Sequence, residues 1–228
     1  MRTVFALILT LTLAMGLNAQ QESSEVDPNY LEDQFYVGIT YNFILNKPSP
    51  IAQRNLSYGL DVGFIKDIPL NRKRNVALGV GLGYAVNSYF TNLLVEEIDS
   101  QFQYSTLASE TDSKRNKLET HLLEFPLEFR WRTSTPEEYK FWRIYTGLKF
   151  SYLLGGRSKL VTDTGKQSFY NTDLRNFQYG LTLNFGYNTF NVHVYYALNN
   201  LFEDNLTLAT GEELNFTPLR IGLIFYIL

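Results

Sequence analysis

Apolar and polar residues alternate along most of this chain with a period of two, the pattern of β-strands whose two faces meet different surroundings. Between residues 142 and 152, for example, Trp142, Ile144 and Leu148 alternate with Arg143 and Lys149. The segments with this pattern are residues 35–43, 58–64, 76–86, 123–131, 142–152, 177–187, 192–198 and 219–227. We therefore predict an all-β fold of eight antiparallel strands.

The links between the predicted strands alternate in length. Residues 87–120 and 153–174 are the longest links, whereas residues 188–190 suffice only for a tight turn. Outer-membrane barrels have an even strand number, short periplasmic turns and longer extracellular loops. The pattern therefore predicts a closed, eight-stranded antiparallel transmembrane β-barrel.

The two faces of these segments differ in charge, and this difference argues against a soluble eight-stranded barrel that carries a ligand. One face is free of charge and rich in aromatic residues, while the other face holds glutamate, arginine and lysine. A soluble barrel would bury those charges in its core and expose a continuous apolar belt to water, and both are costly. A barrel surrounded by lipid avoids both costs.

The charged face predicts an ion-paired interior. The residues of this candidate network are Asp61, Glu124, Glu128, Arg130, Arg143, Lys149 and Arg220. If residues 132–141 form a hairpin turn, one register sets Glu124 opposite Lys149 and Glu128 diagonal to Arg143. Eight strands leave an interior wide enough for little more than side chains, so we expect a plugged lumen. A proton or ion path is the alternative interpretation of the same charges.

Pro126 lies inside the fourth predicted strand. Proline has no N–H to donate to a ladder and is unusual in a regular central strand. We therefore expect a bulge or local kink at this position.

The first residues predict export. Arg2 precedes an apolar run from residue 4 to residue 16, and the small Ala19 follows, which is the pattern of a signal peptide spanning residues 1–19. Residues 20–34 are acidic and polar and form the expected periplasmic leader, so residues 35–228 are the expected outer-membrane barrel domain. No later stretch approaches the roughly 20 apolar residues that a membrane-spanning helix needs.

Composition narrows the chemistry further. A net charge of −3 gives no basic footprint for nucleic acid. The absence of cysteine excludes disulfides, thiolate ligands and a lipid-bearing cysteine. His121 and His193 are the two histidines of the chain, which leaves few candidates for a catalytic or metal site. We expect no cofactor, no metal and no enzymatic activity.

The segment Leu122-Leu123-Glu124-Phe125-Pro126-Leu127-Glu128-Phe129-Arg130, followed by Tyr145-Thr146-Gly147-Leu148-Lys149-Phe150-Ser151-Tyr152, resembles the PorT-like outer-membrane β-barrel family. The resemblance implies an integral outer-membrane barrel of bacteria that often run type IX secretion. In that family the founding member is needed for cargo export and surface attachment. The family offers no catalytic residues to carry over to this chain.

Four functional hypotheses follow from the sequence. The first is a non-enzymatic accessory or interaction subunit of the cell outer membrane, in type IX protein secretion or gliding. Its partners would be outer-membrane lipid and other envelope or secretion proteins, reached through extracellular loops such as the acidic residues 87–120. The alternatives are a narrow, porin-like channel, a lipid-modifying enzyme at the rim around His121, and a barrel that tethers the envelope.

Overall fold

The computed structural model describes residues 33–99, 101–107, 113–133, 141–188 and 190–227. Regular structure in these residues is entirely β-strand. The strands are β1 (Gln34–Leu45), β2 (Tyr58–Pro69), β3 (Val76–Phe90), β4 (Leu93–Ile98), β5 (Gln101–Thr106), β6 (Ser113–Arg132), β7 (Trp142–Thr162), β8 (Lys166–Tyr170), β9 (Phe177–Tyr187), β10 (Phe190–Ala197) and β11 (Thr217–Ile227). The expected signal peptide, and the expected leader up to residue 32, lie outside the described residues.

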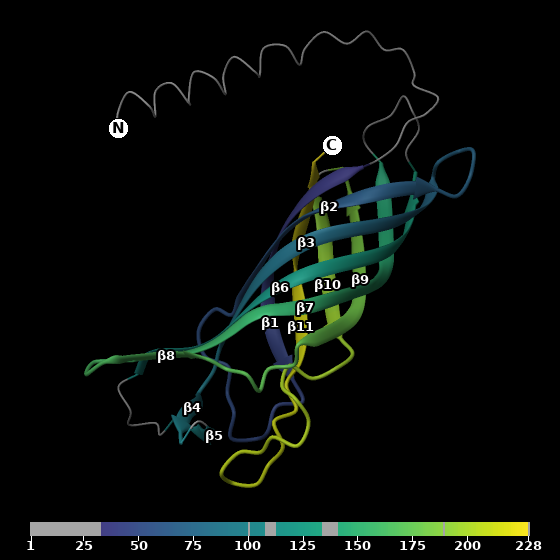
Figure 1. Cartoon of the computed structure of the whole chain (residues 1–228). Coiled ribbons are helices and arrows are strands. Elements are labelled where there is room, and N and C mark those ends of the chain that lie inside the picture. The colour runs from purple at the N-terminus through teal and green to yellow at the C-terminus, as the bar shows by residue number, and fades with distance from the viewer. Residues whose placement is uncertain (1–32, 100, 108–112, 134–140, 189, 228) are drawn as a thin grey trace, which may run out of the picture. The chain divides into compact units, whose positions relative to one another are not determined.

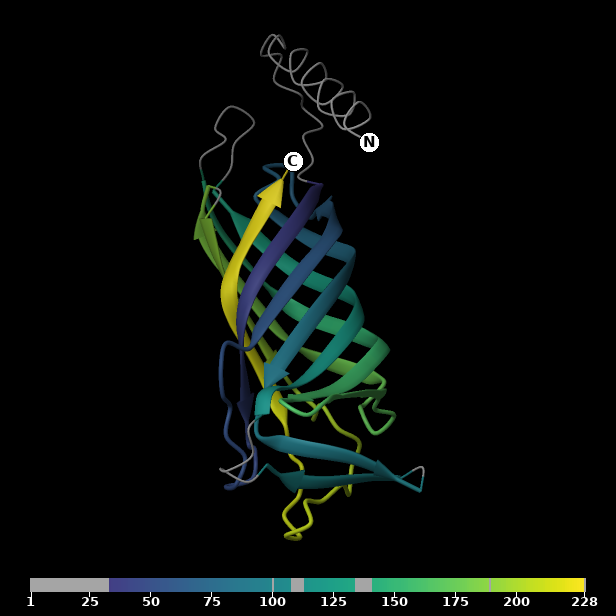
Figure 2. The same cartoon turned by 90° about the vertical axis from the view of Figure 1, so that its left-hand side faces the viewer.

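Eight strands form a closed antiparallel barrel (Figure 1, Figure 2). Their order is β6-β3-β2-β1-β11-β10-β9-β7, and the pairing of β6 with β7 closes the ring. This confirms the predicted fold class and strand number. Closure also satisfies the backbone groups at every strand edge, which a sheet in lipid requires.

Short links and long links lie at opposite ends of the barrel. The short links, residues 70–75, 133–141 and 188–189, join strands at the end where β1 begins and β11 ends. Phe35 pairs with Ile227 there. The long links gather at the opposite end, which is therefore the extracellular end by the habit of outer-membrane barrels.

The strand faces have the polarity of a barrel in lipid. Outward side chains are apolar and exposed, as Phe35 (61 %) and Leu181 (48 %) illustrate. Inward side chains on the same strands are buried, and they include charged residues such as Glu124 and Arg130. No helix in the described part of the chain is long and apolar enough to cross a membrane.

The first barrel strand begins one residue earlier than predicted, at Gln34, which is the last residue of the expected leader. Asp33 forms an ion pair with Lys66, 2.5 Å between Oδ2 and Nζ, and accepts a hydrogen bond from the backbone N–H of Asp67. Burial raises the pKa of Asp33, but these hydrogen bonds more than offset that effect and leave its pKa below the ordinary 3.8.

Inward glycines make room for large side chains in the narrow interior. A Cβ atom on Gly83 would overlap the hydroxyl oxygen of Tyr36, which reaches across from β1. A Cβ atom on Gly147 would overlap the backbone carbonyl oxygen of Leu127 on the neighbouring strand. Glycine at these positions therefore permits close packing inside eight strands.

Pro126 interrupts a ladder without shifting it, so the irregularity at this position is a gap in the pairing rather than a bulge. The β3–β6 register is the same on both sides, with Val80 paired to Leu127 and Gly83 paired to Glu124, and the pairs between them are missing. Gly81 leaves space for the proline ring, since a Cβ atom there would lie 2.9 Å from Pro126 Cγ. The register shifts recorded between β6 and β7 lie elsewhere.

Strands continue into residues 87–120 and 153–174, which the sequence predicts to be links. β6 begins at Ser113 and β7 continues to Thr162, and β8 pairs with the end of β7. We call residues 113–120, 155–162 and 166–170 the lateral arm. A register shift at His121/Leu122 leaves Leu154 as the extra residue where β7 passes from wall to arm, and such bulges bend a strand. Figure 1 shows the arm leaving the barrel wall sideways.

The long links also form a second apolar core, which we call the outer cap. Loop residues such as Ile51, Leu174 and Phe202 pack in one cluster with the inward-facing ends of the wall at Leu122 and Leu153. Isolated β-bridges connect the links to one another, at Gln53–Thr91, Leu174–Phe202 and Tyr104–Leu208.

A buried hydroxyl ties the β4–β5 hairpin into the outer cap. The Tyr104 hydroxyl donates to Asp173 (2.9 Å) and lies 3.2 Å from Asn171 Oδ1. Burial raises the pKa of Tyr104, so the hydroxyl stays protonated and remains a donor. The cap therefore combines apolar packing with polar contacts between links.

Candidate functional site: the interior ion pairs and the outer rim

The interior charges form two groups along the barrel. The group nearer the short turns centres on Asp67, which binds two arginines. Asp67 Oδ1 accepts from Arg130 Nη1 (3.0 Å) and Arg132 Nη1 (2.9 Å), and its Oδ2 accepts from Arg132 Nη2 (2.8 Å). All three side chains are fully buried.

Arg130 also binds on its other sides. Its Nε donates to Glu128 (3.1 Å), its Nη2 donates to Gln34 (3.0 Å), and its guanidinium lies 4.4 Å from the ring centroid of Tyr145. Buried charges need such pairing and hydrogen bonding, because their desolvation is otherwise very costly. Arg130 thus joins β1, β2, β6 and β7 through one side chain.

The second group lies nearer the middle of the wall. Glu124 forms an ion pair with Lys149, 2.8 Å between Oε2 and Nζ, and its Oε1 accepts from Arg220 Nη1 (3.1 Å). Arg220 also lies 3.9 Å from Asp61 Oδ1 and 3.8 Å from the ring centroid of Tyr195. The structure therefore brings four of the expected network residues into one cluster.

The register differs from the one the sequence suggested. Glu124 is paired with Ser151 rather than Lys149, so its ion pair with Lys149 is diagonal. Arg143 is paired with Arg132, which places it too far along β7 for the expected diagonal contact with Glu128. The pair that borders the turn is Arg132–Arg143 rather than Trp131–Trp142, so the turn is displaced by one residue along the chain and the partner of each β6 residue near it moves by two.

Arg143 and Glu128 have other partners. The Arg143 guanidinium lies 4.5 Å from the ring centroid of Phe141 and 5.4 Å from that of Tyr226. Glu128 accepts from Asn184 (3.1 Å) in addition to Arg130.

Asp67, Arg132 and Gln34 also take part in the interior network but were not among the expected network residues. Asp67 and Arg132 occupy inward-facing positions in the alternation. They lie beyond the predicted ends of their strands, which were residue 64 for the strand of Asp67 and residue 131 for the strand of Arg132. Extending the alternation along each strand would have found them.

The two histidines lie in different surroundings. His193 is buried on the inward face of β10 and lies 2.5 Å from Asn184 Oδ1, so it is a hydrogen-bonded lumen residue, as expected. His121 lies on the outward face of β6, where its Nδ1 is 2.5 Å from the Tyr84 hydroxyl and its Nε2 is 3.5 Å from Glu119. The described residues contain no cluster of three or more side chains suited to hold a metal ion.

A groove of about 300 Å³ lies beside His121 on the outer wall. Its lining residues are Tyr84, His121, Leu154, Gly155, Arg157 and Tyr170. Arg157 donates to the Tyr170 hydroxyl (2.9 Å) and its guanidinium lies 4.8 Å from the same ring centroid. The groove therefore lies where the apolar wall meets the lateral arm.

Comparison with known proteins agrees with this architecture. The model of a family described as outer membrane protein beta-barrel domain matches residues 18–203. No curated protein matches the chain. The family match covers most of the chain and coincides with an eight-stranded barrel whose outside is apolar and whose inside is charged. The chain belongs to the outer membrane protein beta-barrel domain family and is an integral outer-membrane barrel protein.

Proposed function

We propose that this protein is a non-enzymatic accessory or interaction subunit of the outer membrane, in type IX protein secretion or gliding. The observation that carries the proposal is the filled interior. Two groups of buried ion pairs cross the lumen, and the outer cap packs against the extracellular ends of the wall. The surfaces that remain for function are the loops and the outward wall.

The loop surface offers a candidate contact region for other envelope proteins. Glu96 and Glu97 are exposed on β4, while Leu93 and Val95 on the same strand are buried in the outer cap. A firmly anchored hairpin that presents carboxylates to solvent suits a partner with a basic surface. The resemblance to the PorT-like family supports a secretion partner.

Deletion of the gene in its native host tests this proposal. We expect cargo proteins to accumulate in the periplasm, and the wild-type chain to restore export. A chain with Glu96→Lys and Glu97→Lys should insert normally but restore less export. The control carries Arg72→Glu and Lys73→Glu on the short turn at the opposite end and should complement fully. Unchanged secretion in the deletion strain would contradict a secretion role.

A narrow channel is the main rival, and conductance separates the two. We expect purified protein in a planar bilayer to give no discrete current steps, because buried charge pairs bridge the lumen. Regular steps from the wild-type chain would favour the channel and contradict the filled interior.

The second candidate function is a lipid-modifying enzyme at the rim. The arrangement of His121 beside Tyr84, Glu119 and the outer groove favours it. Neither Tyr84 nor Glu119 is the serine or cysteine nucleophile usual in acyl transfer, which favours the non-enzymatic proposal. A change in outer-membrane lipid composition after His121→Ala, with the barrel still folded, would support the enzyme instead.

A further inference from the structure

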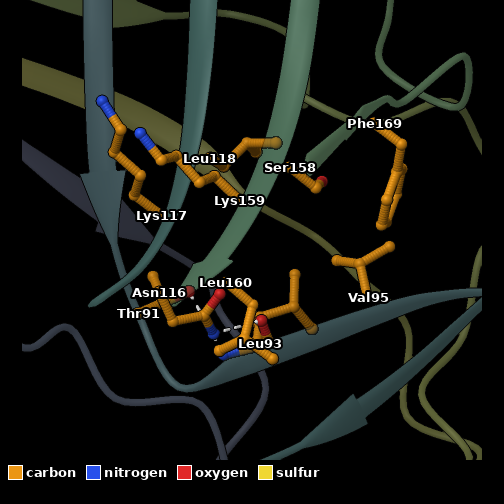
Figure 3. A pocket seen from close by; sticks show the side chains of 10 residues that line it. All are labelled: Thr91, Leu93, Val95, Asn116, Lys117, Leu118, Ser158, Lys159, Leu160 and Phe169. Atoms are coloured by element: carbon orange, nitrogen blue, oxygen red, sulfur yellow. Dashed lines mark hydrogen bonds between the residues drawn. The ribbon is translucent and has the colours of Figure 1, made fainter. Parts of the chain in front are cut away.

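The lateral arm has two chemically different faces. Its inner face carries Leu118, Leu160 and Phe169, which line a narrow gap shared with Leu93 and Val95 of the β4–β5 hairpin (Figure 3). Lys117 and Lys159 also border this gap. The outer face of the arm is formed by the residues that continue the outward-facing positions of the wall strands, and this face is strongly basic. The cations on that face are Arg115, Lys117, Arg157, Lys159 and Lys166.

Like charges oppose one another on the basic face. Lys117 is paired directly with Lys159 across β6 and β7, and Figure 3 shows both side chains directed away from the hairpin. Charge repulsion from Lys166 is the largest cause of a lowered pKa of Lys159. Like charges directly opposite each other destabilise a sheet.

Carboxylates among the described residues neutralise only some of the arm's cations. Glu119 forms an ion pair with Lys117. Lys114, at the second β6 register shift, pairs with Asp163. Among the described residues, no carboxylate lies within ion-pair distance of Arg115, Arg157, Lys159 or Lys166. The face therefore keeps a surplus of positive charge.

The basic face lies on the side of the arm away from the β4–β5 hairpin. The arm leaves the wall sideways, and the β4–β5 hairpin lies on the side of the arm that faces away from the barrel (Figure 1). The basic face is on the opposite side from the hairpin, so it overhangs the outward surface of the barrel. Successive outward positions on β6 run from apolar Leu123 through His121 and Glu119 to Lys117. The cations thus lie just beyond the apolar belt along the strands.

A cavity adjoins these cations on the lipid side. The 300 Å³ groove combines the apolar surfaces of Tyr84, Leu154 and Tyr170 with the guanidinium of Arg157. Such a groove can hold the sugar or upper acyl part of a lipid while its anionic groups reach the lysines. A soluble anion would use the cations but not the groove.

We propose that the basic face of the lateral arm and the adjoining groove bind a phosphorylated glycolipid of the outer leaflet. Arg157, Lys159 and Lys166 bind its phosphate groups, and Tyr84 and Leu154 contact its apolar part. This site is independent of the proposed secretion role, because it needs the arm and not the acidic hairpin.

The test measures binding of lipid A to the full chain in detergent, by native mass spectrometry. Each basic residue near an anionic lipid surface changes binding by about fivefold, so Lys159→Gln with Lys166→Gln should weaken binding roughly ten- to thirtyfold. The matched control, Arg72→Gln with Lys73→Gln, removes two exposed cations at the other end of the barrel. It should bind as the wild type does.

Two further arms identify the ligand. Enzymatically dephosphorylated lipid A should bind the wild type as weakly as phosphorylated lipid A binds the arm variant. Inorganic phosphate at equal concentration should not displace lipid A, because it cannot fill the groove. Equal binding by the arm variant and the wild type would overturn the site, and displacement by inorganic phosphate would overturn the assignment to a lipid. The heat-dependent gel shift of folded barrels confirms that each variant is folded.

Discussion

Replacing Asp67 by asparagine tests whether the interior is a dry, ion-paired plug. Asp67 accepts three hydrogen bonds from two fully buried arginines, Arg130 and Arg132. Asparagine keeps the shape but removes the negative charge. Removing one partner of a buried ion pair costs about 3–5 kcal/mol, because the remaining charge stays desolvated. Arg130 keeps Glu128 and Gln34, so the expected loss lies toward the lower end of that range.

Urea unfolding of the refolded barrel in phospholipid vesicles measures this loss. Trp131 and Trp142, which lie on the outward face, report the transition by fluorescence. The matched control is Asp163→Asn, which removes an exposed ion pair with Lys114 and should cost about 0–1 kcal/mol. Adding Arg132→Gln to Asp67→Asn should cost less than the sum of the two single changes, since the residues share one network.

An equally small loss for Asp67→Asn and Asp163→Asn would refute this reasoning. It would mean that water screens the interior charges as well as it screens the surface pair. A hydrated interior would in turn favour the channel over the plug.

Three further predictions concern packing, the cap and the start of the barrel. Gly83→Val should destabilise the barrel by about 1–3 kcal/mol because its side chain would overlap Tyr36, whereas Gly165→Ala, which meets no atom within 4 Å, should be tolerated in the same unfolding assay. Tyr104→Phe should make the outer cap more sensitive to limited proteolysis while the gel shift stays normal, and unchanged proteolysis would contradict a role for its hydroxyl. The pair formed by Asp33 should stabilise the barrel at neutral pH by less than about 1 kcal/mol, and this contribution should be lost as the pH falls through its lowered pKa, below 3.8. The stability difference between wild type and Asp33→Asn should therefore vanish in strong acid, and a difference that persists there would contradict the ion pair.

The sequence predicted most of the barrel because each strand carries its own local signal. A period of two, a charge-free face and alternating link lengths are properties of consecutive residues, so eight strands and their lipid-facing side follow without tertiary information. The same alternation identified Glu124, Lys149 and Arg220 as inward residues, and the structure places them in contact.

Tertiary structure alone decided the pairing register, the cap and the arm. Register depends on which turn residues leave the ladder, and a shift of two residues preserves the face of every side chain, so the inward pattern cannot distinguish the two registers. The long links had weak periodicity, because their strands are stabilised by packing on one another and on the barrel end rather than by a continuous lipid-facing stripe. The bend at Leu154 turns the basic end of β7 away from the barrel wall. It comes from one extra residue in a ladder, and a ladder exists only once two strands have paired.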